Sequence, residues 1–164
     1  MAEKNAYQVT DWNGQSGERW VANQARLDAM VTVFGQAAIE AAAPMPGERV
    51  LDVGCGAGAS SLALAARVGA GGQVLGVDIS EPLIGRARAL APRDTSALFQ
   101  VADASSAELP EGAFDILFSR FGVMFFDDPT DAFAHMRRAL RPGGRVAFVW
   151  WRGAAEHAWV RLRM

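Results

Sequence analysis

The feature that most constrains the fold is the stretch from Arg49 to Ser61, which reads RVLDVGCGAGASS. A short apolar run ends abruptly at the first of three alternating glycines, Gly54, Gly56 and Gly58, and small residues follow. This pattern predicts a buried strand, a glycine loop and a helix. Because glycine has no Cβ, such a loop turns tightly and brings backbone amides close to a ligand at the positive end of the helix. The stretch therefore predicts a cradle for a nucleotide-like ligand.

Asp52 is unusual because it places a carboxylate inside this apolar strand, two residues before the first glycine. A buried carboxylate is costly unless it is hydrogen-bonded. We therefore expect Asp52 either to hold the amides of the glycine loop or to meet a cationic group of the ligand.

Composition limits the classes of function. The chain has 164 residues, of which 51% are hydrophobic and 21% charged, as in a soluble globular domain with its own core. A net charge of −2 without a basic cluster argues against nucleic acid as the partner and favours a small ligand. No apolar run reaches bilayer length, and MAEKNAYQVTDW contains no signal-peptide core, so we expect no membrane span. The single cysteine, Cys55, predicts a reducing, cytoplasmic location.

The N-terminal part, residues 1–45, is predicted to be a helical segment in front of a ligand-binding domain at 46–164. We interpret Met1–Gly17 as an irregular lead-in, because it has no clear period. From Glu18 to Pro44, apolar residues recur at helical spacing and predict one amphipathic helix. Packing is expected for Trp20, whereas for Trp12 both packing and a lid over the ligand remain open.

Beyond the glycine loop, strands are predicted to alternate with helices. The further strands are expected at 73–79, 97–102, 114–119 and 145–151, with helices at 59–68, 80–92 and 128–141. Such alternation implies right-handed crossovers and a parallel sheet covered by helices on both faces. Ligands in such sheets bind at the carboxyl ends of the strands. The residues expected at those ends are Gly54, Asp78, Asp103 and Ser119.

Asp78 stands roughly 20 positions beyond the glycine loop, where an acidic residue can accept hydrogen bonds from ribose hydroxyls. The loop also satisfies the permissive pattern of dinucleotide-binding domains. The loop and Asp78 alone therefore leave two readings open, a nicotinamide-dependent oxidoreductase fragment and another nucleotide-binding enzyme.

Five motifs together resemble the class I S-adenosylmethionine-dependent methyltransferases, and most of all the bacterial group related to the ubiquinone and menaquinone biosynthesis enzymes. They are VLDVGCGAG, GVDIS, VADA, FDILFS and LRPGGRVAFV, and the resemblance covers nearly the whole chain. It implies a doubly wound, Rossmann-like, mainly parallel sheet of order 3-2-1-4-5. It also implies methyl transfer from S-adenosylmethionine to a small-molecule acceptor, with S-adenosylhomocysteine as product. An NAD(P)-binding oxidoreductase fragment and a non-catalytic adenosyl-ligand-binding or interaction domain remain as alternatives.

The resemblance also implies roles for individual residues. The methionine moiety would be held by Asp52 and the backbone of Gly54, Cys55, Gly56 and Gly58. The adenosine would meet Asp78 at the ribose, Ile79 at the adenine face, Asp103 at the amino group and Ala104 through its amide. The methyl-donor end would be bordered by Ser119 and Arg120. No residue is identified as a catalytic base, and the acceptor stays unidentified.

Several other residues have plainer interpretations. Cys55 is expected to be a small apolar filler, because no partner base is near it in sequence. His135 and His157 lack metal-ligand spacing, so no metal site is predicted. Asp115 is expected to be a structural acid. One apolar run contains Phe121, Met124, Phe125 and Phe126. We expect these residues to belong to the core, and the alternative is that they line a pocket for the acceptor.

The end of the chain departs from the family pattern. Family members continue beyond the fifth strand and complete a seven-stranded sheet, so we expect the last two strands to be missing here and 152–164 to begin the next helix. The fifth strand would then expose an apolar edge with Val146, Phe148 and Trp150, which predicts self-association.

Overall fold

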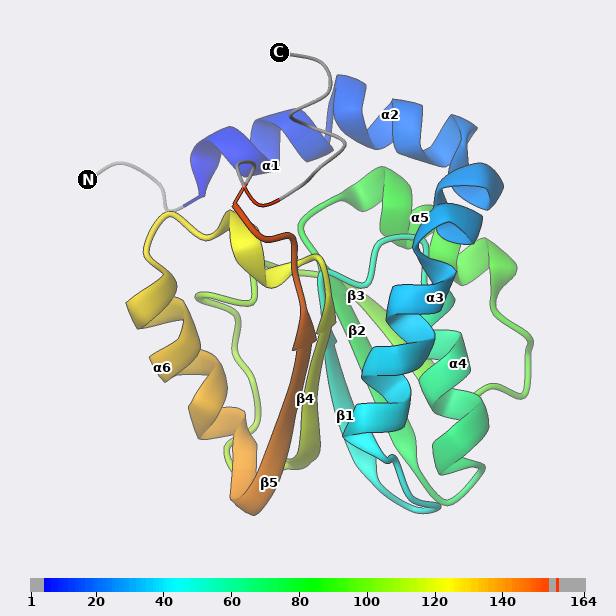
Figure 1. Cartoon of the computed structure of the whole chain (residues 1–164), viewed down its shortest axis with the longest axis vertical. Helices are drawn as coiled ribbons and strands as arrows, with labels where there is room; N and C mark the ends of the chain where they lie inside the picture. Colours follow the sequence, from blue (N-terminus) through cyan, green and yellow to red (C-terminus); the bar gives the residue numbers. More distant parts are fainter. Residues whose placement is uncertain (1–4, 154–155, 157–164) are drawn as a thin grey trace.

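The computed structural model describes residues 5–153 and residue 156 (Figure 1). Its centre is a five-stranded sheet in which every neighbouring pair is parallel and the order is β3-β2-β1-β4-β5. The strands are β1 (Arg49–Val53), β2 (Gln73–Asp78), β3 (Ala97–Val101), β4 (Phe114–Arg120) and β5 (Leu140–Val149). The predicted doubly wound Rossmann-like topology is confirmed.

Helices cover both faces of the sheet, as the alternation of elements predicts. One face carries α3 (Gln24–Ala42), α4 (Ala59–Val68) and α5 (Glu81–Leu90), and the other carries α6 (Pro129–Ala139) (Figure 1). Side chains of β1 alternate between the two cores: Val50 packs with residues of α3 and α4, whereas Leu51 packs with residues of α6. The central strands β1 and β4 are therefore buried on both sides, which explains their apolar sequences, whereas the outer strands β3 and β5 are more exposed.

The starts of two helices follow directly from local sequence. The Ser80 hydroxyl accepts a hydrogen bond from the Leu83 amide, and the Asp128 carboxylate accepts one from the Asp131 amide. Each helix also has a proline in its first turn, where the missing N–H costs nothing. These caps fix the starts of α5 and α6 where the sequence predicts them.

The N-terminal segment differs from the prediction of a lead-in followed by one helix. Three helices are present: α1 (Ala6–Trp12), α2 (Gln15–Ala22) and α3. Asparagines mark both breaks, because the side chains of Asn13 and Asn23 donate to the helix carbonyls of Val9 and Arg19 and compete with helix continuation. In Figure 1, α1 and α2 lie across the end of the sheet at which the strands finish.

The last strand also differs from the prediction. It runs from Leu140 to Val149 rather than over 145–151, so Trp150 lies beyond its end. A register irregularity between Phe114 and Ile116 accommodates the proline and glycines near its start. The strand is an outer strand of the sheet, as predicted. The helix expected at 152–164 falls largely outside the described residues. Within the part that is described, no helix combines the length and apolar character needed to cross a bilayer.

Candidate functional site

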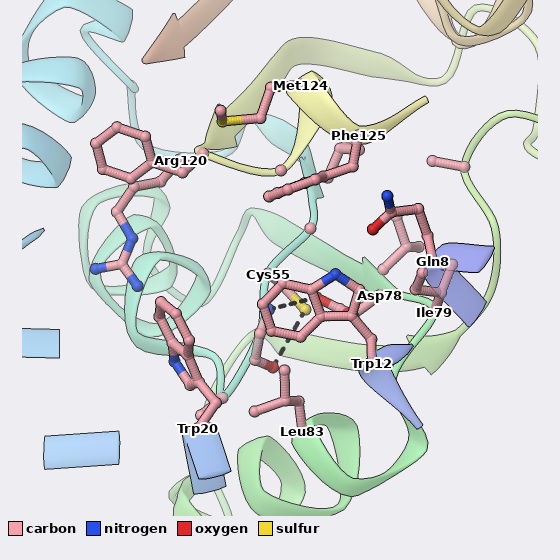
Figure 2. A pocket seen from close by; sticks show the side chains of 18 of the residues that line it. Gln8, Trp12, Trp20, Cys55, Asp78, Ile79, Leu83, Arg120, Met124 and Phe125 are labelled. Carbon is pink, nitrogen blue, oxygen red and sulfur yellow. Dashed lines mark hydrogen bonds between the residues drawn. The ribbon is translucent and has the colours of Figure 1, made fainter. Parts of the chain in front are cut away.

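A cavity of about 340 Å³ lies at the carboxyl ends of the strands (Figure 2). Its floor is the glycine loop after β1 together with the ends of β2 and β4, and its roof includes residues of α1, α2 and α3. Eight of the predicted site residues line it: Gly54, Cys55, Gly56, Asp78, Ile79, Asp103, Ala104 and Arg120. The predicted residues that do not line it are Asp52, Gly58 and Ser119.

The glycine loop needs its glycines for two different reasons. Gly54 has φ of +68°, and a Cβ there would lie 2.5 Å from the Gly122 Cα, so two backbone segments touch at this point. Gly56 has φ of +55°, but a Cβ there would meet nothing within 4 Å. Both positions favour glycine by conformation. Of the two, only Gly56 has open space where a Cβ would lie. A ligand can therefore approach the backbone closely at Gly56.

Asp78 binds the glycine loop from the neighbouring strand. Its carboxylate accepts hydrogen bonds from the Gly56 amide at 2.8 Å and from the Ser80 amide at 2.9 Å. Burial raises the pKa of the Asp78 carboxyl, although these amide donors act in the opposite direction. The carboxylate is thus held in place in the cavity wall, with remaining capacity to accept further hydrogen bonds.

Asp52 neither holds the amides of the glycine loop nor faces the ligand cavity, the two environments that the sequence predicts. It is completely buried, and its Oδ2 accepts hydrogen bonds from the hydroxyls of Ser60 at 2.7 Å and Ser61 at 2.6 Å. Its Oδ1 has no hydrogen-bond partner among the described residues. Burial raises the pKa of this carboxyl, against the effect of the two serines. Asp52 therefore joins β1 to the first turn of α4, behind the glycine loop, and not through the loop amides.

Ser119 and Gly58 also lie behind the cavity wall. The Ser119 hydroxyl donates to the Val53 carbonyl at 2.7 Å and accepts from the Gly122 amide at 3.1 Å, which ties the end of β4 to the end of β1. At Gly58, a Cβ would come within 2.9 Å of the Phe99 ring. These residues shape the loop without facing the cavity.

Asp103 is fixed by a residue that the sequence analysis did not single out. The Asn5 side-chain amide donates to Asp103 Oδ2 at 2.7 Å and to the Ser105 hydroxyl at 3.2 Å, and the Ser105 amide donates to Asp103 Oδ1 at 2.8 Å. Asn5 precedes α1 by one position and belongs to no recognisable motif. Its left-handed φ of 56° is typical of asparagine and glycine, but a sequence alone does not reveal it.

Aromatic side chains enclose much of the remaining cavity. Trp12 makes edge contacts with Trp20, at 5.8 Å between ring centroids, and with Phe125 at 5.9 Å (Figure 2). Phe121 stacks on Trp151 at 4.5 Å. The sequence predicts core for Phe121, Met124, Phe125 and Phe126, with a pocket as the alternative, and all four line the cavity. Phe126 also packs against the core on the α6 side of the sheet, so the expectation is corrected for the other three. Trp12 and Trp20 both line it as well, so Trp20 is more than a packing residue.

Arg120 provides the cation in the wall. Its guanidinium donates to the Asp28 carboxylate of α3 at 2.9 Å, and both side chains are largely buried. Its aliphatic part lies against Gly35, where a Cβ would approach the Arg120 Cδ to 3.0 Å. The ion pair therefore joins α3 to the end of β4 at the cavity.

Other polar groups have structural surroundings. Burial raises the pKa of the Cys55 thiol well above its usual value, so it stays protonated and suits the predicted role of a filler. Asp115 accepts hydrogen bonds from the Arg49 amide and the Arg141 side chain, as expected of a structural acid. His135 binds the Ala107 carbonyl. No group of three metal-ligating side chains occurs among the residues that the structure describes.

Fold and site together define an α/β domain with a nucleotide-type pocket at the carboxyl ends of its parallel strands. A family model described as a methyltransferase domain matches residues 51–148. The chain therefore belongs to the methyltransferase domain family. The oxidoreductase alternative loses its support, because the glycine loop is now placed within this family.

Similar proteins carry out methyl transfer on different acceptors. The chain is 37% identical over 121 residues to an aklanonic acid methyltransferase from Streptomyces sp. (strain C5), covering 71% of this chain and 54% of that protein. It is 36% identical over 110 residues to a demethylmenaquinone methyltransferase from Clavibacter sepedonicus, covering 67% and 44%. The chain spans about half the length of these curated relatives. The predicted resemblance to quinone methyltransferases is confirmed.

A solved structure agrees with the fold and with the family. The phosphoethanolamine N-methyltransferase 2 of Haemonchus contortus, solved in complex with phosphomonomethylethanolamine and S-adenosylhomocysteine, has a TM-score of 0.63 and 32% identity. The match covers 70% of this chain and 27% of that one.

Proposed function

We propose that this chain binds S-adenosylmethionine and transfers its methyl group to a small-molecule acceptor, with S-adenosylhomocysteine as product. The observation that carries this proposal is the convergence of Asp78, Asp103 and the glycine loop on one cavity. The open space beside Gly56 fits a ligand that approaches the backbone closely. Family membership supports the same chemistry.

Different residues bind different parts of the donor. The backbone from Gly54 to Gly56, including Cys55, holds the methionine part, supported from behind by Asp52, Gly58 and Ser119. Asp78 accepts the ribose hydroxyls and Ile79 lies against the adenine. Asp103 and the Ala104 amide bind the adenine edge, and Arg120 borders the methyl end. Bound in this way, the donor supplies an electrophilic methyl group on a sulfonium.

The protein's contribution to catalysis is positioning and exclusion of water. Holding donor and acceptor in line supplies a large part of the rate enhancement. Trp12, Trp20 and Phe125 line the cavity with apolar surface, and we propose that they limit the access of water to the reacting groups. We assign no general base.

We further propose three properties of the molecule. Residues 46–164 form the donor-binding domain, and residues 1–45 form a helical segment that roofs it. The outer strand β5, with Val146 54% exposed, supports self-association through that edge. The single buried Cys55 suits a reducing compartment such as the cytoplasm.

Calorimetric titration with S-adenosylhomocysteine, and in parallel with NAD⁺, tests the proposed ligand. We expect binding of the first and none of the second. NAD⁺ binding with no response to S-adenosylhomocysteine would overturn the proposal. Binding without turnover over a broad panel of acceptors would instead leave the non-catalytic adenosyl-ligand-binding alternative.

A further inference from the structure

We propose that Asn5 is a positioning residue for recognition of the donor's adenine ring, because it holds the Asp103 carboxylate toward the exocyclic amino group. This inference rests on the proposed function, in which Asp103 accepts a hydrogen bond from that group. It adds to the donor site a residue of the N-terminal segment, outside the span that the family model matches.

The hydrogen bonds around Asp103 set its orientation. Asn5 Nδ2 donates to Oδ2 at 2.7 Å and the Ser105 amide donates to Oδ1 at 2.8 Å, so each carboxylate oxygen has one protein donor. A carboxylate accepts about four hydrogen bonds, which leaves capacity for a ligand. Rotation of the carboxylate breaks both bonds. Asp103 itself is half-buried and lines the cavity.

Asn5 is committed to the protein and has no donor left for the ligand. Its Nδ2 serves Asp103 and the Ser105 hydroxyl, its Oδ1 accepts from the Asp127 amide at 2.8 Å, and its own amide donates to the Asp127 carboxylate at 2.7 Å. The residue is only 4% exposed. Asn5 is among the residues that line the cavity, but both of its side-chain N–H groups are already used by the protein, so it acts on the adenine through Asp103 and does not donate to the ligand.

The opposite end of α1 provides a matched control. Asn13 donates to the Ile79 carbonyl at 2.9 Å and accepts from the Glu81 amide at 2.9 Å, so it also ties α1 to the cavity rim. No hydrogen bond of Asn13 reaches Asp103. Loss of Asn13 therefore loosens the helix without releasing the carboxylate.

The experiment compares two ligands, S-adenosylhomocysteine and S-inosylhomocysteine, in which an oxygen replaces the adenine amino group. Calorimetry gives the ratio of their dissociation constants for the wild type, Asn5→Gly and Asn13→Ala. Glycine is chosen because it keeps the left-handed backbone and its amide bond to Asp127. We expect the wild type to prefer the adenine ligand by about 10-fold or more, since the inosine analogue leaves a charged acceptor unpaired.

In Asn5→Gly we expect this preference to fall by about 5-fold, the value of one net hydrogen bond. In Asn13→Ala we expect both ligands to weaken together, with the preference unchanged. An unchanged preference in Asn5→Gly, whether or not both ligands bind more weakly, would overturn the inference. Asn5→Ser, which lacks the Nδ2 amide that reaches Asp103, replaces the glycine variant if that variant does not fold, and the same outcomes decide.

Two further results separate this inference from the proposed function. If the wild type does not bind S-adenosylhomocysteine, both fail together. If it binds with the expected preference, and Asp103→Ala loses that preference while Asn5→Gly keeps it, the adenine site stands and only the role of Asn5 is overturned.

Discussion

Asp78 is the single side chain on which donor affinity is expected to depend most. Replacement by alanine removes the proposed ribose acceptor and also releases the Gly56 amide. We expect Asp78→Ala to weaken S-adenosylhomocysteine binding by about 1–3 kcal/mol in calorimetry, because buried polar partners lose their hydrogen bonds. Asp78→Asn, which keeps one carbonyl acceptor, should lose less. Unchanged affinity in the alanine variant would remove Asp78 from the site.

Gly54 and Gly56 differ in what surrounds them, and their alanine variants should differ accordingly. Both have positive φ, which costs an alanine about 1–2 kcal/mol. Only Gly54 has a backbone atom, the Gly122 Cα, within 2.5 Å of the added Cβ. We therefore expect Gly54→Ala to lower the free energy of unfolding in urea clearly more than Gly56→Ala does. Equal losses would show that the contact between these two loops is not close.

Asp52 and Asp115 should respond to pH in opposite directions. Burial raises the pKa of Asp52 in the folded state, so its stabilising contribution is full below about pH 4 and is lost as pH rises through the folded pKa. For Asp115, burial works to raise the pKa, but the donors Arg49 and Arg141 outweigh it and lower the pKa overall. Its contribution is therefore present at neutral pH and lost as pH falls through that lowered pKa.

Urea unfolding between pH 3 and 8 tests this pair. Relative to the wild type, Asp52→Asn should become more stable as pH rises, and Asp115→Asn should become less stable. The measured quantity is the difference in free energy of unfolding at each pH. A difference for Asp52→Asn that does not change with pH would contradict the buried, unpartnered carboxylate oxygen.

At the scale of elements, Arg145, in the middle of the outer strand β5, joins that strand to the end of α3. Its guanidinium donates to the carbonyls of Ala42 and Ala43, the last groups of that helix, and pairs with Glu48 at 2.6 Å. The Arg145 hydrogen bond is the main cause of the lowered pKa of Glu48. A basic side chain at a helix C-terminus satisfies carbonyls that have no partner within the helix.

We expect Arg145→Ala to lower the free energy of unfolding by about 1–3 kcal/mol, because three acceptors lose a charged donor. Arg93→Ala, in the exposed loop after α5, is the control and should change stability by less than about 0.5 kcal/mol. Chemical denaturation measures both. A loss no larger than that of the control would mean that α3 is held by its apolar contacts alone.

For the whole molecule, the two outer strands of the sheet offer a comparison. Val146 on β5 is 54% exposed and Leu98 on β3 is 53% exposed, so they are apolar positions of similar accessibility on opposite edges. We expect Val146→Lys to shift the sedimentation profile toward monomer, since a lysine on an edge strand opposes pairing with another chain. Leu98→Lys should leave it unchanged. A wild type that sediments as a monomer at all concentrations would contradict self-association.

Local sequence predicted the elements whose causes are local. The strand, glycine loop and helix around Gly54, the caps Ser80 and Asp128, and the acid at the end of β2 all depend on residues within a few positions of one another. It failed where short polar side chains compete with the helix, as at Asn13 and Asn23, and where an apolar run faces a cavity instead of a core, as at Phe125. Hydrophobicity does not distinguish a core from an apolar pocket wall.

The sequence by itself determined the order of elements, their parallel arrangement and the set of acids and glycines that reach one edge of the sheet, because periodicity, caps and crossover handedness are properties of neighbouring residues. Only the tertiary structure decided that Asp52 binds the serines of α4 and that Asn5 holds Asp103, which lies 98 positions away. The reason is physical: a hydrogen bond between two separate elements depends on how the packed core places them, and no local pattern records that placement.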